Sequence, residues 1–246
     1  MPQQKNLTEA LKRLSEPGEL GKAIAQLDSA VTHRRIYLMG CGRSGTWLLT
    51  SLFSSFDNVS LVAKELPIEY FGVLKTNAPV LAIKRDRHAY QLVEEIPPSI
   101  EIVWIVRHPF DVLTSHNPME SRRYYIQPWR FVGEMLALKY LVENRQAGTL
   151  VIRYEDLVQD PIGTQQRIAE RFGLSIGFPP DQINEKFHAP PEADIAMHGQ
   201  RKIDSASVGK FRNHPENIEH LRKICPRVEP VLAWVAKEFS YDIALA

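Results

Sequence analysis

The chain has 246 residues, a length that suits one α/β domain with a small appendage and allows a sizeable core. Its 30 Lys and Arg residues balance 29 Asp and Glu residues, so we expect no nucleic-acid binding, which needs an excess of cations. No apolar stretch is long enough to cross a bilayer, the first residues hold no apolar signal core, and Cys41 and Cys225 do not make a disulfide framework. We therefore expect a cytoplasmic protein without a membrane span.

The first thirty or so residues predict two short helices, which the Pro17-Gly18 pair separates. Apolar residues repeat at helical spacing in both: Leu7, Leu11 and Leu14 in the first, and Ala23, Ile24, Leu27 and Val31 in the second. We expect residues 1–33 to form a helical cap on a single α/β domain that spans residues 34–246.

From residue 34 onward, short apolar runs alternate with helical patterns. The runs predict buried strands at Ile36–Met39, Val80–Ile83, Ile100–Val106 and Thr149–Ile152, with a further short strand at Val59–Val62. Helical patterns follow near Trp47, Phe131 and Ile168, Pro226 is predicted to open the last helix, and residues 178–211 predict a long ordered loop or lid. The alternation indicates an α/β fold of three layers, in which helices flank a central parallel sheet.

The turn after the first predicted strand reads Gly40-Cys41-Gly42-Arg43-Ser44-Gly45-Thr46. Two glycines at this spacing are a weak signal alone, but a strand before the turn and a helix after it are the context of a phosphate-binding P-loop. Backbone N–H groups of such a turn converge and the helix dipole adds a positive end, so an anion is favoured there. Arg43 supplies a fixed cation within the turn.

Two departures from nucleotide triphosphatases indicate which anion binds. The lysine that reaches the terminal phosphates is absent, because Thr46-Trp47 follow the second glycine. The strand at Ile102–Val106 ends in Arg107, where such enzymes commonly have a carboxylate for Mg²⁺. Cations at two neighbouring strand ends predict a ligand with two separated anionic groups and no required metal. The eight histidines and two cysteines also show no metal-ligand spacing.

At these residues the chain resembles the sulfotransferases that use 3′-phosphoadenosine 5′-phosphosulfate (PAPS). Gly42-Arg43-Ser44-Gly45-Thr46-Trp47 matches the first motif of this family, with Gly in place of Pro. Arg107-His108-Pro109-Phe110-Asp111, with Ser115 eight residues after the arginine, matches the second, and Tyr154-Glu155-Asp156-Leu157 matches a weaker third. The resemblance covers roughly residues 35–174. Within the family, the chain is similar in character to the bacterial trehalose-type and protein-tyrosine-type branches.

The resemblance implies a role for each matched residue. The first motif, Gly42, Arg43, Ser44, Gly45, Thr46 and Trp47, would hold the 5′-phosphosulfate through its amides and hydroxyls. Arg107 and Ser115 would hold the 3′-phosphate, and Tyr154 would lie near the adenine. In this family a basic residue late in the chain closes over the donor. The candidates here are Ser205, Lys210 and Arg201, of which Lys210 is ranked first.

The reaction needs a cation and a base. Negative charge builds on the departing phosphate oxygen, where Arg43 would stabilise it by charge and hydrogen bonds. The acceptor hydroxyl must lose its proton to a base. Glu65 is the first candidate, because residues 63–71 resemble a glutamate-bearing stretch of bacterial trehalose sulfotransferase. The alternatives are Asp86, at the histidine position of many cytosolic members, and His88, two residues later.

The sequence thus predicts a PAPS-dependent sulfotransferase that releases PAP and acts on a hydroxyl of a small-molecule, lipid or carbohydrate acceptor. The alternatives are a P-loop small-molecule kinase, disfavoured by the missing lysine and carboxylate, and a noncatalytic nucleotide-binding protein. Residues 122–130 either line an acceptor cleft or are a solvated helix start that packs Trp129 inward. Acceptor pockets are built by variable loops, so the identity of the acceptor does not follow from the sequence. The oligomeric state does not follow from it either.

Overall fold

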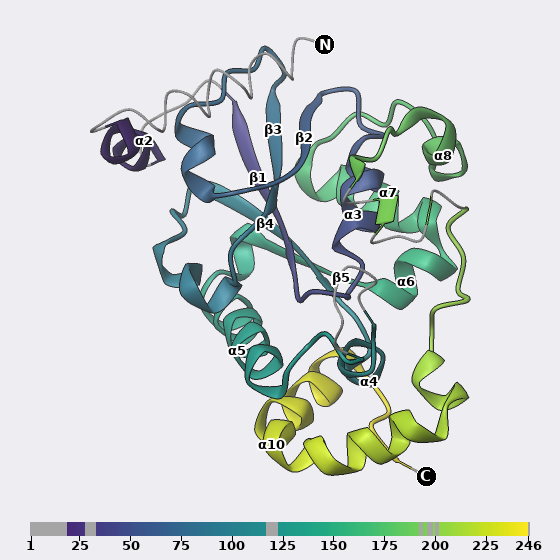
Figure 1. The fold of residues 1–246 in the computed structure, drawn as a ribbon. Coiled ribbons are helices and arrows are strands. Elements are labelled where there is room, and N and C mark those ends of the chain that lie inside the picture. Colours follow the sequence, from purple (N-terminus) through teal and green to yellow (C-terminus); the bar gives the residue numbers. More distant parts are fainter. Residues whose placement is uncertain are drawn as a thin grey trace.

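A computed structural model describes residues 19–27, 33–116, 123–191, 194–195, 199 and 202–245. Five parallel strands form one sheet in the order β2-β3-β1-β4-β5 (Figure 1). The strands are β1 (Arg34–Gly40), β2 (Val59–Leu66), β3 (Val80–Arg85), β4 (Ile100–Val106) and β5 (Thr149–Arg153). The predicted α/β fold with a central parallel sheet is confirmed.

The described residues form helices of two kinds. The α-helices are α2 (Glu19–Leu27), α3 (Thr46–Phe53), α4 (Pro109–Leu113), α5 (Pro128–Asn144), α6 (Tyr154–Gln159), α7 (Pro161–Phe172), α8 (Ile183–Lys186) and α10 (Pro215–Phe239). The 3₁₀ helices are η1 (Ile68–Gly72), η2 (Ala89–Gln91), η3 (Val93–Glu95), η4 (Gln146–Gly148), η5 (Pro180–Gln182) and η6 (Lys210–Asn213). None of the described helices is both long enough and apolar enough to cross a membrane.

Different helices cover the two faces of the sheet, because side chains alternate along each strand. On β1, Tyr37 and Met39 belong to a buried cluster that includes residues of α5 and α10. Ile36 and Leu38 belong to a second cluster that includes residues of α3 and α7. In Figure 1, α3, α6 and α7 lie on one side of the sheet and α5 on the other. This is the predicted three-layer arrangement.

The strand order brings the two predicted cations to one edge of the sheet. β1 and β4 are neighbours, with Gly40 in register with Ile105. Because both strands point the same way, the turn after β1 and Arg107 after β4 leave the sheet side by side. A ligand at this edge therefore meets both.

β2 is longer than predicted and carries a candidate base. The sequence ends this strand at Val62, where Lys64 and Glu65 interrupt the apolar run. In the structure it continues to Leu66, with an irregularity in its pairing with β3 between Val62 and Glu65. The extension brings Glu65 into register with Lys84 of β3.

The predicted start of the last helix at Pro226 is wrong. α10 begins at Pro215 and continues through Pro226 and Pro230. A proline inside a helix frees one carbonyl, but both prolines lie on the exposed face, where water can bind that carbonyl. Buried apolar residues recur at helical spacing along the opposite face, from Leu221 to Val235, and this packing keeps the helix continuous.

The helix predicted around Leu7–Leu14 lies outside the described residues, as does Val31, whereas the second predicted helix is present as α2. Ala23 and Leu27 are buried, but Ile24 is 49% exposed, so its prediction as part of the packed face is wrong. The Arg35 guanidinium donates to the carbonyls of Leu27 (2.6 Å) and Gln26 (3.2 Å), which satisfies the end of α2. The division of the chain at residue 33 stays a prediction.

Candidate functional site

The turn between β1 and α3 is held in shape by its own polar groups. Ser44 donates to the carbonyl of Cys41 twice, from its backbone N–H (3.1 Å) and from its hydroxyl (2.7 Å). Ser44 is 1% exposed. In this structure its hydroxyl therefore stabilises the turn.

Two left-handed residues give this turn its tight curvature. Gly45 has a φ of +98°, which glycine adopts without strain, and a Cβ atom there would lie 2.6 Å from the ring of Tyr154. Arg43 has a φ of +66°, which is uncommon outside glycine. Successive N–H groups in such a turn form a concavity that binds anions.

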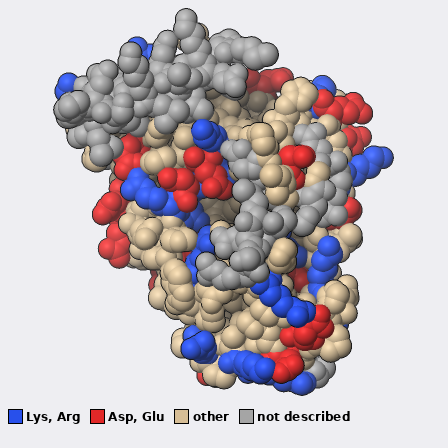
Figure 2. All heavy atoms as spheres, viewed as in Figure 1, with Lys and Arg blue, Asp and Glu red and all other residues tan. Residues whose placement is uncertain are grey.

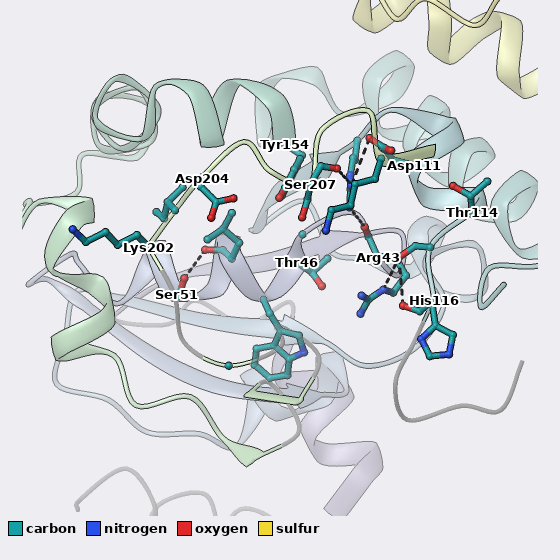
Figure 3. Close-up of a pocket in the computed structure, with 18 of the residues that line it drawn as sticks. Arg43, Thr46, Ser51, Asp111, Thr114, His116, Tyr154, Lys202, Asp204 and Ser207 are labelled. Carbon is teal, nitrogen blue, oxygen red and sulfur yellow. Dashed lines mark hydrogen bonds and ion pairs between the residues drawn. The ribbon is translucent and has the colours of Figure 1, made fainter. Parts of the chain in front are cut away.

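A cavity of about 760 Å³ opens beside the turn. Most of the residues predicted to bind the donor line it: Arg43, Gly45, Thr46, Trp47, Arg107, Ser115, Tyr154 and Lys210. Gly42 and Ser44 are not among its lining residues. In Figure 3, Lys202 lies at one side of the labelled residues and Thr114 and His116 lie at the other, with Thr46 between them.

Two guanidinium groups share this cavity. Arg43 donates from Nε to the hydroxyl of Ser115 (3.0 Å), which joins residues that the family motifs assign to opposite ends of the donor. Arg107 donates from Nη1 to the carbonyl of Arg43 (3.3 Å). Burial, and next the positive charge of Arg107, lower the pKa of Arg43 from its usual value. Bringing an anion to this place would offset that repulsion.

Arg107 has one buried N–H group without a hydrogen-bond partner. Its guanidinium lies 4.6 Å from the centroid of the Tyr154 ring, and its Nη2 donates to the carbonyl of Ser207. The side chain is 10% exposed, and its Nε is buried without a hydrogen-bond partner. A buried unpaired donor costs about 1–3 kcal/mol, and a phosphate oxygen in the cavity would satisfy it. The residues present therefore fit the nucleotide that the motifs predict.

Residues 202–211 close one side of the cavity. Lys202, Asp204 and Ser207 line it together with Lys210. The sequence assigned no role to the first three, because nothing in this weakly periodic stretch marks which residues turn inward. Of the other late candidates, Ser205 is exposed and is not a lining residue, and Arg201 lies outside the described residues.

Asp111 fastens this segment to the end of β4. It accepts the backbone N–H groups of Gly209 (2.8 Å) and Phe211 (3.1 Å), and it lies 3.5 Å from Nη2 of Arg107. The sequence marks Asp111, because this residue is part of the second motif. It does not mark the partners Gly209 and Phe211, because they follow Asp111 by about a hundred residues.

Glu65 does not line the cavity. Its carboxylate pairs with the ammonium group of Lys84, which is 4% exposed. The Lys84 Nζ in turn lies 4.2 Å from the centroid of the Trp47 ring. Glu65 itself is 48% exposed, so its connection to the cavity runs through Lys84 and Trp47.

The two alternative bases follow β3 and are also outside the cavity lining. Asp86 accepts the backbone N–H of Arg87 (2.6 Å), and burial raises its pKa above the usual value. His88 has its Nδ1 3.4 Å from the buried carboxylate of Glu134. Burial, and next the charge of Arg130, lower the pKa of His88, which favours the neutral imidazole that a base requires.

The basic and aromatic segment after the second motif divides between two places. Arg123 and Tyr124 line the cavity, and Tyr124 stacks on His220 with ring centroids 3.8 Å apart. The Tyr124 hydroxyl donates to the carbonyl of Glu216 at the start of α10 (3.2 Å). Arg122 lies outside the described residues.

The second part of this segment lies against the P-loop. A Cβ atom at Gly42 would come within 3.1 Å of Nη2 of Arg130 and 3.2 Å of the Tyr125 ring. Trp129 is 64% exposed, so the alternative in which it packs inward is wrong. An exposed indole beside His88 is free to contact a bound molecule.

The face shown in Figure 2 carries charges of both signs. Acidic and basic side chains are interspersed over the face shown in Figure 2 and border the hollow near its centre. Within the part of the chain that the structure describes, no group of three or more His, Cys, Asp or Glu residues is placed to hold a metal ion. The cations that line the cavity are side chains of arginine and lysine.

A family model supplies an independent comparison. The model described as "Sulfotransferase family" matches residues 63–179, from β2 to the loop after α7. The predicted resemblance to sulfotransferases is confirmed. The matched segment contains the second and third motifs, whereas the P-loop precedes it. No curated protein sequence matches the chain.

Solved sulfotransferase structures share this fold. The sulfotransferase domain from the curacin biosynthetic pathway has a TM-score of 0.62 at 14% identity, with 87% of this chain and 100% of that chain covered. The sulfotransferase domain of the olefin synthase from Synechococcus PCC 7002 also has a TM-score of 0.62 at 14% identity, covering 88% and 98%. Retinol dehydratase, in complex with androsterone and the inactive cofactor PAP, has a TM-score of 0.53 at 14% identity, covering 87% and 84%. At these identities the likeness shows the sulfotransferase fold.

Proposed function

We propose that this protein transfers a sulfuryl group from PAPS to a hydroxyl of a small-molecule, lipid or carbohydrate acceptor. The observation that carries the proposal is the buried, unpartnered Nε of Arg107 in the same cavity as the P-loop turn and Arg43. Such a cavity suits a ligand with two anionic groups. A nucleotide with a 3′-phosphate and a 5′-phosphosulfate has them.

The donor would lie along the cavity. The amides of the turn residues that line the cavity, Arg43, Gly45, Thr46 and Trp47, would hold the 5′-phosphosulfate at the N-terminus of α3, where the helix dipole favours an anion. Arg107 and Ser115 would hold the 3′-phosphate, with Tyr154 near the adenine and Lys210 over the outer side. The likeness to retinol dehydratase, a protein of the same fold described with PAP, supports this choice of nucleotide.

The reaction would be an in-line displacement at sulfur. A bond forms between the acceptor oxygen and sulfur, and the bond between sulfur and the bridging phosphate oxygen breaks, which releases PAP. Arg43 would stabilise the charge that builds on that phosphate oxygen. In this structure its Nε donates to the Ser115 hydroxyl, and in the proposed complex that Nε would donate to the phosphate instead.

The acceptor proton would go to a base at the ends of β2 and β3. Glu65 is the proposed residue, with Asp86 and His88 as the alternatives. As a base, Glu65 has to leave Lys84 or approach the acceptor together with it. The exposure of its carboxylate allows either movement.

The test is transfer of label from ³⁵S-labelled PAPS to a fractionated metabolite extract, followed by identification of the labelled product. We expect a labelled sulfate ester and tight binding of PAP in calorimetry. Phosphate transfer from ATP with Mg²⁺, without use of PAPS, would favour the kinase alternative. Tight PAP binding without transfer to any of a wide acceptor panel would favour a noncatalytic nucleotide-binding protein.

A further inference from the structure

Asp111 has no role in the reaction as proposed above, although it lies in the cavity lining beside Arg107. Its side chain is 0% exposed. A carboxylate is stable in such a place only if donors surround it. The identity of those donors therefore indicates what the residue does.

The donors come from two distant parts of the chain. One oxygen accepts the N–H of Gly209 (2.8 Å) and the other accepts the N–H of Phe211 (3.1 Å). The first oxygen also lies 3.5 Å from Nη2 of Arg107. The dashed lines at Asp111 in Figure 3 mark its interactions with the residues drawn there. One carboxylate thus joins the segment that closes the cavity to the end of β4.

This arrangement fixes two cations at once. Lys210 stands between the two residues whose amides are held, and Gly209 before it has the left-handed φ of +71° that turns the chain into η6. Arg107 is held at its outer end by Asp111 and by the carbonyl of Ser207, which leaves its Nε unpartnered. The backbone of Lys210 and the guanidinium of Arg107 are therefore positioned relative to each other through Asp111.

We propose that Asp111 is a positioning residue for recognition of the 3′-phosphate. It holds Arg107 and the Lys210 backbone so that both cations reach that phosphate. The inference rests on the proposed use of a 3′-phosphorylated donor and goes beyond it, because it assigns the selectivity for this phosphate to a residue that need not touch the nucleotide.

Simple electrostatics predicts the opposite effect. A carboxylate near a phosphate repels it, so removing the charge would strengthen binding of the phosphorylated nucleotide. Positioning predicts weaker binding, because an amide in place of the carboxylate cannot accept from two N–H groups and an arginine. The sign of the change in affinity separates the two explanations.

The experiment compares PAP with AMP, which lacks the 3′-phosphate, by calorimetry on wild-type protein and on Asp111→Asn. The ratio of the two affinities measures what the 3′-phosphate contributes. We expect the variant to lower PAP affinity about tenfold or more, as for loss of hydrogen bonds to a charged group, and to leave AMP affinity within about twofold. An unchanged or larger ratio would overturn the proposal.

Glu155→Gln is the matched control. Glu155 is also a buried carboxylate near the end of β4, where it accepts the N–H of His108 (2.9 Å) and the hydroxyl of Tyr241 (2.8 Å), but it does not line the cavity. We expect it to lower the melting temperature and keep the PAP-to-AMP ratio. The same loss of ratio in both variants would mean that any buried carboxylate here has this effect, against a specific role for Asp111.

A measurement on the wild-type protein keeps the proposal testable if Asp111→Asn does not fold. In the free protein, the amides of Gly209 and Phe211 should exchange slowly with deuterium, because Asp111 accepts both. Exchange at the rate of open loop amides would overturn the proposal that Asp111 holds this segment. Failure of wild-type protein to bind PAP more tightly than AMP would instead count against the proposed donor, so the two failures are distinguishable.

Discussion

The carboxyl edge of the sheet contains two regions with different charge balance. At the ends of β2 and β3, Lys84 pairs with Glu65, Arg87 with Glu69 and Arg85 with Glu134. At the ends of β1 and β4, two arginines share one cavity and a buried Nε has no partner. In the first region each of these cations pairs with an acid. In the second, Arg107 lies 3.5 Å from Asp111 and still has an unpartnered Nε, which a bound anion would satisfy.

In the proposed reaction, the β1–β4 region would bind the donor and the β2–β3 region would take the acceptor proton. Binding a highly charged donor needs cations that are held in place before it arrives, since reorganising them would weaken binding. Removing a proton from an uncharged hydroxyl needs a base within hydrogen-bond reach, and the three proposed bases lie in the β2–β3 region.

The largest effect is expected in the β2–β3 region. Glu65→Gln should lower turnover of PAPS with its acceptor by about 10²–10⁴-fold, as for loss of a general base, while PAP affinity stays the same. Asp86→Asn and His88→Asn are the matched variants and should retain turnover. Normal turnover in Glu65→Gln, with loss in one of the other two, would move the base to that residue.

The next effect concerns the β1–β4 region. Arg43→Ala should lower turnover by about 10²–10³-fold, because the charge on the departing phosphate oxygen loses its cation. Arg87→Ala removes an equivalent cation from the other region, where Glu69 pairs with it, and should leave PAP affinity and its salt dependence unchanged. Equal losses of PAP affinity in both variants would contradict the contrast between the regions.

The smallest effect is a pH dependence of stability with one contributor in each region. Burial lowers the pKa of both His88 and His108 below the ordinary 6.5. The unfolded chain then binds protons more readily, so this contribution to stability is complete above about pH 6.5 and is lost as the pH falls through the folded-state pKa.

The measurement is the melting temperature at pH 7.5 and pH 5.5. We expect the wild-type protein to melt at a lower temperature at the lower pH, and His108→Asn to reduce that difference more than His88→Asn. The reason is that His108 is enclosed by Phe211 and Tyr241, whereas the His88 side chain is 30% exposed. A larger reduction in His88→Asn would reverse the assignment.

Local patterns in the sequence predicted the strands, the helices and the first residues that were assigned to the cavity. The alternation of short apolar runs with helical spacing predicts the strands, and the parallel arrangement follows from that alternation. Arg43 and Arg107 could be predicted to lie at the same edge of the sheet because each follows a buried strand by no more than three residues. Each of these inferences needs only a few neighbouring residues.

Tertiary packing decided what those patterns do not encode. Apolar packing carries α10 through Pro226, against the local preference of proline. The strand order and the pairing between β2 and β3 join Glu65 to Lys84, and the return of the chain to the end of β4 brings Gly209 to Asp111. These contacts connect residues 19 and 98 positions apart, and only the folded arrangement of strands sets which side chains meet across such separations.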